Sequence, residues 1–408
     1  MMSKSLHNPT NSMVETVDEQ AIIARMRALK PFLQEEAVRN ERLRSLTKET
    51  EAALREAGAF KMFTPRRWGG SGMSVSGFCR AQVEVGKGDL AAAWVLQILN
   101  TTTWIGSLTS DALQETLFAK GPALICGVLN PPGKARQVDG GYKVSGRWPY
   151  SSGSAQADWM MAGCQIINKD DSQAPGVHVV YLPMSQVTIV DSWFVTGLQG
   201  TGSDTVVADD VFVPDHMVVK ADKSFGYAET RKRHVGATSD RLPILATARM
   251  GNLAQLLGGA QQMLELIEAD VIRKPLIGTT YAKKSDAGVI VHDIGRIAAQ
   301  LDNAELILFD ALKQFDDRAA AGEFWSDVEL SRCKAQGSQV VGLIHRSIEE
   351  IMFLGGSSAF ALSNPLQRYW RDIHIALRHI LHMPQIGYEL YGRDRMGLKP
   401  NISPPGSY

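Results

Sequence analysis

YKVSGRWPYSSGSAQADWMMAG, residues Tyr142 to Gly163, is the stretch around which the rest of the chain is organised. Large side chains at even-numbered positions fall on one face of a strand: Tyr142, Val144, Trp148 and Tyr150. That face leads into a turn of small hydroxyl residues, and a second strand is predicted at 157–163. Two such strands joined by a Ser/Gly turn form an apolar wall with hydrogen-bond donors at its edge. The wall either receives a planar ring or is an ordinary hairpin in a β-domain core.

On both sides of this stretch the hydrophobic period changes. From Ala123 the chain shows short β-rich runs separated by Pro, Gly, Asn and Asp, namely ALICGVL, YKVSGRWPY, DWMMAGCQI, VHVVYL, VTIV and TVVADDVFV. Before them, apolar residues recur at helical spacing, which predicts helices over 18–57, 75–85 and 90–105, the last of them buried. The middle of the chain is therefore predicted to be an antiparallel β domain that follows a helical one.

After the β-rich region the helical period returns. A seam of apolar residues repeats at spacings of three and four from Ile294 to Phe315 and requires partner helices. Candidates lie at 244–271, 328–353 and 365–390, which predicts a four-helix bundle. The expected fold class is α+β, with a helical domain at 1–120, a barrel-like β domain at 121–235 and the bundle at 236–408. The first 16 residues are expected to be disordered, and the charged segment 228–241 is expected to be a linker.

The composition limits the partners of this chain. Its 408 residues carry 43 Lys plus Arg and 43 Asp plus Glu, with no block of like charge, so neither nucleic acid nor an anionic membrane surface is an expected partner. No apolar run approaches the roughly 20 residues of a membrane span, and MMSKSLHNPTNS has no signal-peptide core. We therefore expect a cytoplasmic protein. Four widely spaced cysteines are expected to be reduced structural thiols: Cys79, Cys126, Cys164 and Cys333.

Several catalytic motifs are missing from the sequence. The glycine-rich GLQGTGSDT, residues 197–205, leads into a predicted strand, whereas a dinucleotide fingerprint opens a helix. There is no His-Glu-x-x-His, no Cys/His cluster at metal spacing and no Gly-x-Ser-x-Gly elbow. Metal hydrolysis and serine esterase chemistry are therefore disfavoured, and no metal is expected.

Polar chemistry is concentrated in NPLQRYWRDIHIALRHILHMP, residues 364–384. On one continuous helix, Asp372, Ile375 and His379 would lie along one stripe, and His374, Arg378 and His382 along its neighbour. A histidine beside a carboxylate and arginines either acts as a general acid or base or holds a bound ring. The alternative is a solvated helix face with salt bridges between helices.

Four stretches together resemble the acyl-CoA dehydrogenase fold over about residues 20–395: FTPRRWGG, GRWPYSSGSAQADWMMAG, GLQGTGSDTVVADDVFVP and RYWRDIHIALRH. More narrowly, the chain is similar to the oxygenase components of two-component flavin-dependent monooxygenases, which hydroxylate aromatics. Acyl-CoA dehydrogenases of the common type carry a catalytic Glu after the third bundle helix. Here that segment reads FLGGSSAFALS and holds no acid, so the usual proton-abstracting base is absent from its place.

The resemblance implies roles for particular residues. Ser152 matches the serine that contacts the redox nitrogen of the flavin, and His379 matches the histidine near its reactive edge, so both are predicted to be catalytic. Cofactor contacts are implied for the residues around the Ser/Gly turn and the glycine-rich loop, namely Trp148, Ser151, Ser152, Trp159, Thr201, Gly202 and Ser203. In VIRKPLIGTT, Arg273 and Gly278 are the best matches for residues that bind a neighbouring subunit's cofactor.

One departure concerns the buried helix at 90–105. Several relatives carry a histidine near its end, but this chain has none between His7 and His178, and Asn100 or Trp104 stands there. Asn100, Trp104 and His374 are predicted to line the substrate pocket. Either the substrate needs no deprotonation, as an indole-like ring would not, or His379 is the base.

The resemblance implies a reaction. Reduced FMN or FAD would come from a separate NAD(P)H-flavin reductase and react with O2, and a flavin hydroperoxide would hydroxylate a phenol-like or indole-like small molecule. The expected assembly is a homotetramer. Alternatives are an acyl-CoA dehydrogenase-type flavoenzyme, an N- or S-oxygenating monooxygenase of the same fold, and a non-enzymatic binding scaffold.

Overall fold

The computed structural model describes residues 18–221 and 237–402. The predicted disorder at 1–16 and most of the predicted linker at 228–241 lie outside this part of the chain. Six helices come first: α1 (Glu19–Ala28), α2 (Lys30–Leu43), α3 (Lys48–Glu56), α4 (Val75–Gly88), α5 (Leu90–Gly106) and α6 (Asp111–Phe118). The helical predictions for this region are confirmed, with 18–57 divided into three helices. The burial of α5 is confirmed as well, since all but one of its 17 residues are buried.

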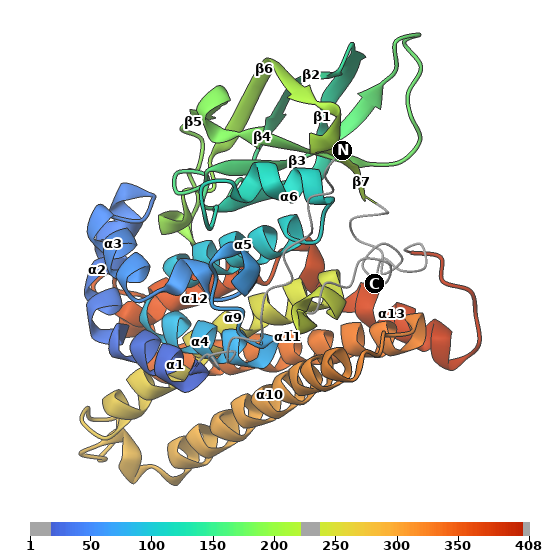
Figure 1. Cartoon of the computed structure of the whole chain (residues 1–408). Coiled ribbons are helices and arrows are strands. Elements are labelled where there is room, and N and C mark those ends of the chain that lie inside the picture. Colours follow the sequence, from blue (N-terminus) through green and yellow to red (C-terminus); the bar gives the residue numbers. More distant parts are fainter. Residues whose placement is uncertain (1–17, 222–236, 403–408) are drawn as a thin grey trace.

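A seven-stranded sheet follows, made of β1 (Ile125–Val138), β2 (Gly141–Trp148), β3 (Trp159–Ile167), β4 (His178–Pro183), β5 (Thr188–Val190), β6 (Thr205–Pro214) and β7 (Val218–Lys220). The strand order is β5-β6-β2-β1-β3-β4-β7. The six β-rich runs of the sequence are confirmed as strands, and the short β7 was not predicted. Helices α5 and α6 lie between the sheet and the rest of the helices (Figure 1).

The alternative that the strands at 142–150 and 157–163 form an ordinary hairpin is wrong. Strand β1 lies between them: it pairs antiparallel with β2 on one side and parallel with β3 on the other. After Trp148 the chain crosses the end of β1 and returns on its far side, so β3 runs in the same direction as β1. The Ser/Gly segment between β2 and β3 is therefore a crossing connection at one end of the sheet, and the sheet is antiparallel except at this one pair.

The C-terminal part is helical and consists of α9 (Ile244–Val271), α10 (Gly288–Ala321), α11 (Asp327–Gly355), α12 (Pro365–Ala376) and α13 (Pro384–Arg395). The long helices pack side by side below the sheet (Figure 1). Helix α9 also packs closely on α4, because Gly86 and Gly258 allow the two backbones to approach: a Cβ on either glycine would come within 2.3 Å of a backbone oxygen of the other helix. This contact fixes the N-terminal helices onto the bundle.

The predicted fourth helix at 365–390 is interrupted, and this corrects the prediction of two continuous stripes. Helix α12 ends at Ala376, a 3-10 turn covers Ile380–His382, and α13 starts at Pro384. Proline has no N–H to donate and disfavours a helical conformation in the residue before it, so the helix breaks ahead of Pro384. His374 and His382 consequently do not share one helix face.

Within residues 18–221 and 237–402, no helix combines the length and the hydropathy that crossing a membrane requires. Cys79, Cys126, Cys164 and Cys333 are buried and unpaired, which confirms their prediction as free thiols.

Candidate active site

A chain of hydroxyl groups joins the Ser/Gly segment to the glycine-rich loop. Ser152 Oγ lies 2.7 Å from Ser203 Oγ, and Ser203 Oγ lies 2.7 Å from Thr201 Oγ1. Thr201 Oγ1 donates to the Leu198 carbonyl oxygen at 2.8 Å. Because Leu198 and Gly202 adopt positive φ, the loop turns tightly enough to place Thr201 and Ser203 beside the end of β2. The structure thus brings together three of the predicted cofactor-binding residues.

Trp94 of α5 connects this chain of hydroxyls to His379. Its indole Nε1 donates to Ser152 Oγ at 3.1 Å. The centroids of its ring and of the His379 ring are 5.7 Å apart, and the two rings are arranged edge to face. The sequence analysis missed Trp94. A signal was present, because a tryptophan on a fully buried helix must find an acceptor for its N–H.

His379 lies at the start of the 3-10 turn after α12 and is mostly buried. Its Nδ1 accepts the Leu381 backbone N–H at 3.3 Å, so the ring proton of the neutral form is on Nε2. In the described part of the chain, Nε2 has no hydrogen-bond partner. Burial lowers the pKa of His379 below its usual 6.5, so at neutral pH the ring is an uncharged donor.

Asp372 joins the glycine-rich loop to α12. Its Oδ1 accepts the Leu198 backbone N–H at 2.5 Å, and Gly197 lies so close to α12 that a Cβ there would come within 2.4 Å of the Arg371 carbonyl oxygen. Burial raises the pKa of Asp372 from 3.8 to about 7. This residue therefore positions the loop that carries Thr201 and Ser203 relative to the helix that precedes His379.

Three predicted site residues have their polar atoms bonded within the core. The Asn100 side chain accepts the Phe63 N–H and donates to the Ala59 and Leu96 carbonyl oxygens. Trp104 Nε1 donates to the Ser239 carbonyl oxygen, and Trp148 Nε1 donates to the Gly163 carbonyl oxygen. All three side chains are fully buried. These side chains have no donor left for a substrate or cofactor.

Two further predicted cofactor residues border the cluster without joining it. Ser151 is buried and donates to the Trp148 carbonyl oxygen at 2.9 Å. Trp159 is half-buried at the start of β3, where it pairs with Ile125.

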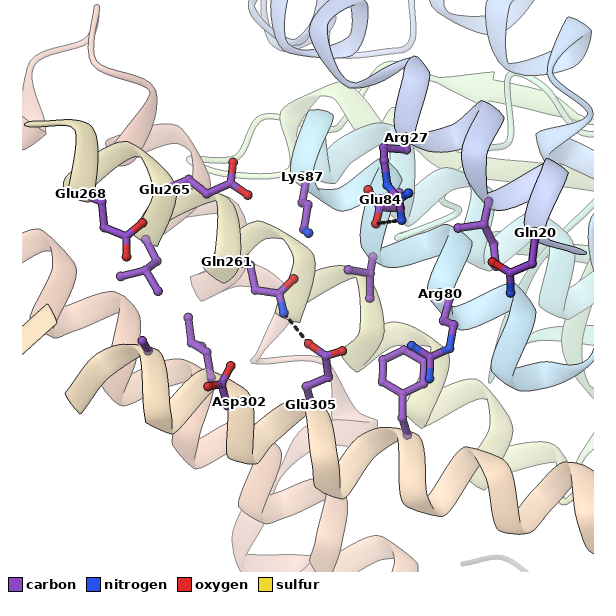
Figure 2. Close-up of a pocket in the computed structure, with 16 residues that line it drawn as sticks. Gln20, Arg27, Arg80, Glu84, Lys87, Gln261, Glu265, Glu268, Asp302 and Glu305 are labelled. Carbon is purple, nitrogen blue, oxygen red and sulfur yellow. Dashed lines mark hydrogen bonds and ion pairs between the residues drawn. The ribbon is translucent and has the colours of Figure 1, made fainter. Parts of the chain in front are cut away.

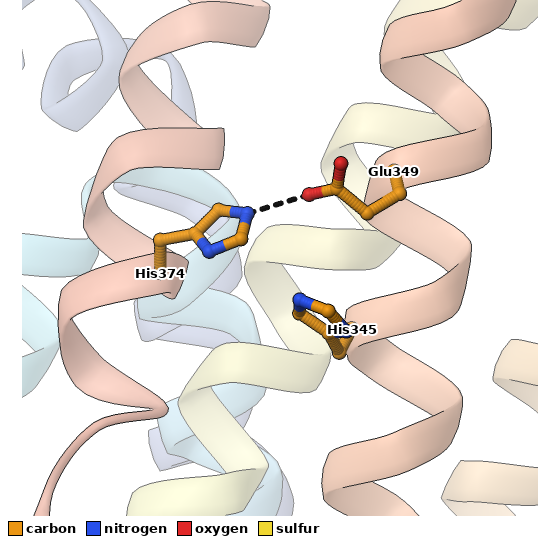
Figure 3. A group of neighbouring side chains, drawn as sticks. All are labelled: His345, Glu349 and His374. Atoms are coloured by element: carbon orange, nitrogen blue, oxygen red, sulfur yellow. Dashed lines mark hydrogen bonds and ion pairs between the residues drawn. The ribbon is translucent and has the colours of Figure 1, made fainter.

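His374 of α12 belongs to a second polar cluster, which it forms with His345 and Glu349 of α11 (Figure 3). Its Nε2 is 2.6 Å from Glu349 Oε1, which also accepts the Trp370 Nε1 proton at 2.8 Å. The ligand atoms of His345, Glu349 and His374 lie within 4.8 Å of one another, so their geometry could hold a metal ion. However, Arg378 Nη1 lies 3.1 Å from His374 Nδ1, so Nδ1 accepts a hydrogen bond and the proton of the neutral ring is on Nε2, the nitrogen that faces Glu349. The arrangement is a contact between α11 and α12, and it does not bring His374 to the predicted substrate pocket.

Arg273 and Gly278 lie in the turn between α9 and α10, at the end of these helices away from the sheet (Figure 1). Both are exposed, and Gly278 has a φ of +80°. They do not contact the hydroxyl cluster of their own chain, so a role at a cofactor requires another subunit.

A hollow of about 530 Å³ opens between α1, α4, α9 and α10 (Figure 2). It is lined largely by charged side chains, including Arg27, Arg80, Glu84, Glu265 and Glu305. None of the predicted site residues lines it.

Comparison with known proteins assigns the chain to a family. Residues 250–384 match the family model described as the acyl-CoA dehydrogenase C-terminal domain. The chain is 30% identical over 381 residues to the flavin-dependent monooxygenase oxygenase subunit HsaA of Rhodococcus jostii, covering 92% of this chain and 98% of that protein. The protein belongs to the flavin-dependent monooxygenase oxygenase components.

Two further relatives agree with this assignment. The oxygenase component of the FADH2-dependent resorcinol hydroxylase of Rhizobium is 28% identical over 95% of this chain and 96% of its own. The structure of XiaF from Streptomyces in complex with FADH2 and glycerol superposes with a TM-score of 0.91, at 27% identity, covering 95% of this chain and 97% of that one. The predicted acyl-CoA dehydrogenase-like α+β fold, the monooxygenase class, and the use of reduced flavin and O2 are confirmed, as is dependence on a separate reductase.

The cluster around Ser152 fits a flavin. An isoalloxazine ring carries N–H donors and carbonyl and nitrogen acceptors along its edge, and it therefore needs both kinds of partner. Hydroxyls supply both, and the unpartnered Nε2–H of His379 supplies a donor. Ser154 Oγ, in the same segment, is buried and has no hydrogen-bond partner.

Proposed function

We propose that this oxygenase component hydroxylates a small aromatic molecule with a phenol-like or indole-like ring, at the cluster formed by Ser152, Ser203, Thr201, Trp94 and His379. The observation that carries the proposal is the Trp94 bridge, which hydrogen-bonds the Ser152 hydroxyl and packs its ring against His379. The bridge joins the two residues that sequence resemblance predicted to be catalytic, although they lie 227 positions apart in the chain.

Ser152, Ser203 and Thr201 would hold the flavin ring edge, and the bound reduced flavin supplies the activation of O2 and the transfer of one oxygen atom to the aromatic ring. Ser152 is fixed as a hydrogen-bonding group because Trp94 donates to it. His379 donates through Nε2 and, being neutral, adds no charge that would attract water. The apolar helix α5 excludes solvent from one side of the cluster.

His379 is also the proposed acid or base for the substrate. Asn100 cannot be the acid or base, because an amide does not titrate and all three of its hydrogen bonds are made to backbone groups of the protein. To deprotonate a phenol, His379 would have to carry its ring proton on Nδ1 and give up the Leu381 N–H, which frees the Nε2 lone pair for the phenol proton. An indole would need no deprotonation.

The proposal includes a homotetramer in the cytoplasm. Support for more than one subunit comes from the turn that holds Arg273: it is exposed and distant from the cluster of its own chain, and Ile272 and Ile277 beside it are 64% and 85% exposed. Four reduced, buried cysteines are consistent with a reducing compartment.

Rapid mixing of the protein and reduced FMN or reduced FAD with O2 tests the proposal. A near-ultraviolet absorbing species that persists for seconds, and whose decay yields hydroxylated product when an aromatic is present, is the expected result. Comparison of the two flavins identifies the preferred one. Peroxide released in large excess over product with every phenol and indole tried would contradict the proposal.

A further inference from the structure

Arg249 of α9 is a buried cation without a counter-anion. Only 2% of its surface is exposed, and its Nη1 has no hydrogen-bond partner. Nε donates to the Leu381 carbonyl oxygen at 3.1 Å. No ion pair is formed by Arg249 with any residue in 18–221 or 237–402. A buried guanidinium without a carboxylate is strongly unfavourable, so proteins seldom keep one for packing alone.

The groups around Arg249 add positive charge or stay neutral. Lys334 of α11 lies near enough that burial and the charge of Arg249 together lower its pKa to about 8, and it also lacks an ion pair in the described chain. Cys333 is another ionisable neighbour, and burial raises its pKa to about 12, so it remains a neutral thiol. Gly337 leaves room for the arginine stem, since a Cβ there would lie 3.1 Å from Arg249 Cδ.

His382 extends this unpaired polar surface toward the active-site cluster. It is 2% exposed, and neither ring nitrogen has a hydrogen-bond partner. It follows Leu381, whose carbonyl oxygen binds Arg249, and its ring lies 5.7 Å from the ring of His379. Contacts therefore connect Ser152 through Trp94 and His379 to His382, and the carbonyl oxygen of the adjacent Leu381 connects this turn to Arg249.

We propose that Arg249, with His382 and Lys334 beside it, binds a carboxylate carried on a side chain of the aromatic substrate. A guanidinium fork matches a carboxylate with two parallel hydrogen bonds, and the free Nη1 is available for one of them. This inference rests on the proposed function and deepens it: the substrate class becomes an aromatic acid, bound with its ring toward His379 and its carboxylate toward α9.

The alternative is that Arg249 has only a structural role and stabilises the 3-10 turn by its hydrogen bond to the Leu381 carbonyl oxygen. The two roles make different predictions. If the role is structural, replacing Arg249 weakens the binding of every aromatic alike. If Arg249 binds a carboxylate, its replacement weakens only the binding of aromatics that carry the acid.

The test compares acids with their neutral amides as ligands of the full-length protein, by isothermal titration calorimetry. The probe pairs are 4-hydroxyphenylacetate with its amide and indole-3-acetate with its amide. They are measured on wild type, Arg249→Met and Arg249→Lys. Arg241→Met is the matched control, because Arg241 also donates to a backbone carbonyl, that of Ala319 at 2.8 Å.

The wild type is expected to bind at least one acid tenfold or more tightly than its amide. Arg249→Met should bring that ratio near one without weakening amide binding, Arg249→Lys should be intermediate, and Arg241→Met should keep the wild-type ratio. The inference is overturned if no acid binds the wild type better than its amide, or if Arg249→Met keeps the ratio or weakens acid and amide equally. Oxygen reactivity of the wild-type reduced-flavin complex without substrate tests the proposed function separately.

Discussion

His374 and His379 are five residues apart, yet the structure gives them opposite surroundings. His374 has a partner at each nitrogen, Glu349 and Arg378, and its ring packs on Trp370 at a surface contact between two helices. His379 is mostly buried, uses only Nδ1 and keeps Nε2 free next to Trp94. The difference suggests a criterion: we expect a site residue to differ from a structural one by its unused hydrogen-bonding capacity in a buried place more than by residue type.

Asn100 and Ser152 repeat the same contrast. Both are buried, but the Asn100 amide is saturated by three backbone groups, whereas Ser152 belongs to a chain of hydroxyls whose protons can be rearranged. Hydroxyl protons rotate to suit a new partner at little cost, and an amide in a fixed network cannot.

The largest expected effect comes from His379→Ala. Because it removes the one free donor of the cluster, hydroxylated product per reduced flavin consumed should fall about 100-fold, with peroxide appearing in its place. Product and peroxide are measured in the same reaction mixture.

His374→Ala is the control for this change, and it should alter product yield less than about threefold. Equal losses from the two substitutions would show that the contrast between the two histidines is mistaken.

A second test separates stability from activity. Asn100→Leu leaves the buried Phe63 N–H without its acceptor and removes the side-chain donor to the Ala59 and Leu96 carbonyl oxygens, so the free energy of unfolding should fall by about 2–4 kcal/mol. Urea titration followed by fluorescence measures it. Ser152→Ala leaves one buried donor, the Trp94 indole N–H, without its acceptor and should lower that free energy by about 1–2 kcal/mol. It should nevertheless reduce coupled hydroxylation more than Asn100→Leu does; the reverse ranking would reassign Asn100 to the site.

Trp94→Phe keeps the ring beside His379 and removes only the N–H that fixes Ser152. Loss of one buried hydrogen bond predicts a weakening of reduced-flavin binding by about tenfold or less, measured by equilibrium titration under anaerobic conditions. Trp370→Phe removes the corresponding N–H at the His374 contact, and no change in flavin binding is expected from it.

Hydrophobic periodicity and the turn residues between the periodic segments were sufficient to predict helices and strands. Helices α4 and α5 and the six predicted strands lie where these patterns placed them. The pairing of β3 with β1 was not predictable, because side-chain alternation says which face a residue occupies and nothing about which strand lies next to it. The break after Ala376 could have been predicted from Pro384, but residues 365–390 were predicted to form one continuous helix.

Part of the candidate site could be proposed from the sequence. Ser152, Ser203, Thr201 and His379 were identified through resemblance, and the structure brings them together. Trp94 and Arg249 each stand in an apolar helical segment, where composition alone classes them as core. Only the structure shows that the Trp94 indole points to Ser152 and that, among residues 18–221 and 237–402, no acid lies beside Arg249.

The smallest effect concerns Asp372 and pH. Its pKa in the folded protein, about 7, exceeds the ordinary 3.8, so between these values the folded state binds more protons than the unfolded state and stability falls as pH rises. Asp372→Asn keeps an acceptor for Leu198 N–H and removes this titration. Denaturation between pH 5 and 7 should show the wild type losing up to about 1 kcal/mol per pH unit relative to the variant; parallel curves would contradict the raised pKa.

The central claim is that Ser152 and His379, joined by Trp94, receive the reactive part of the flavin. A structure determined with reduced FMN or FAD bound tests it most directly. The account predicts the isoalloxazine ring within hydrogen-bonding distance of Ser152 Oγ, with His379 beside the same ring. A flavin bound elsewhere in the chain, with Ser152 and His379 contacting only protein, would contradict it.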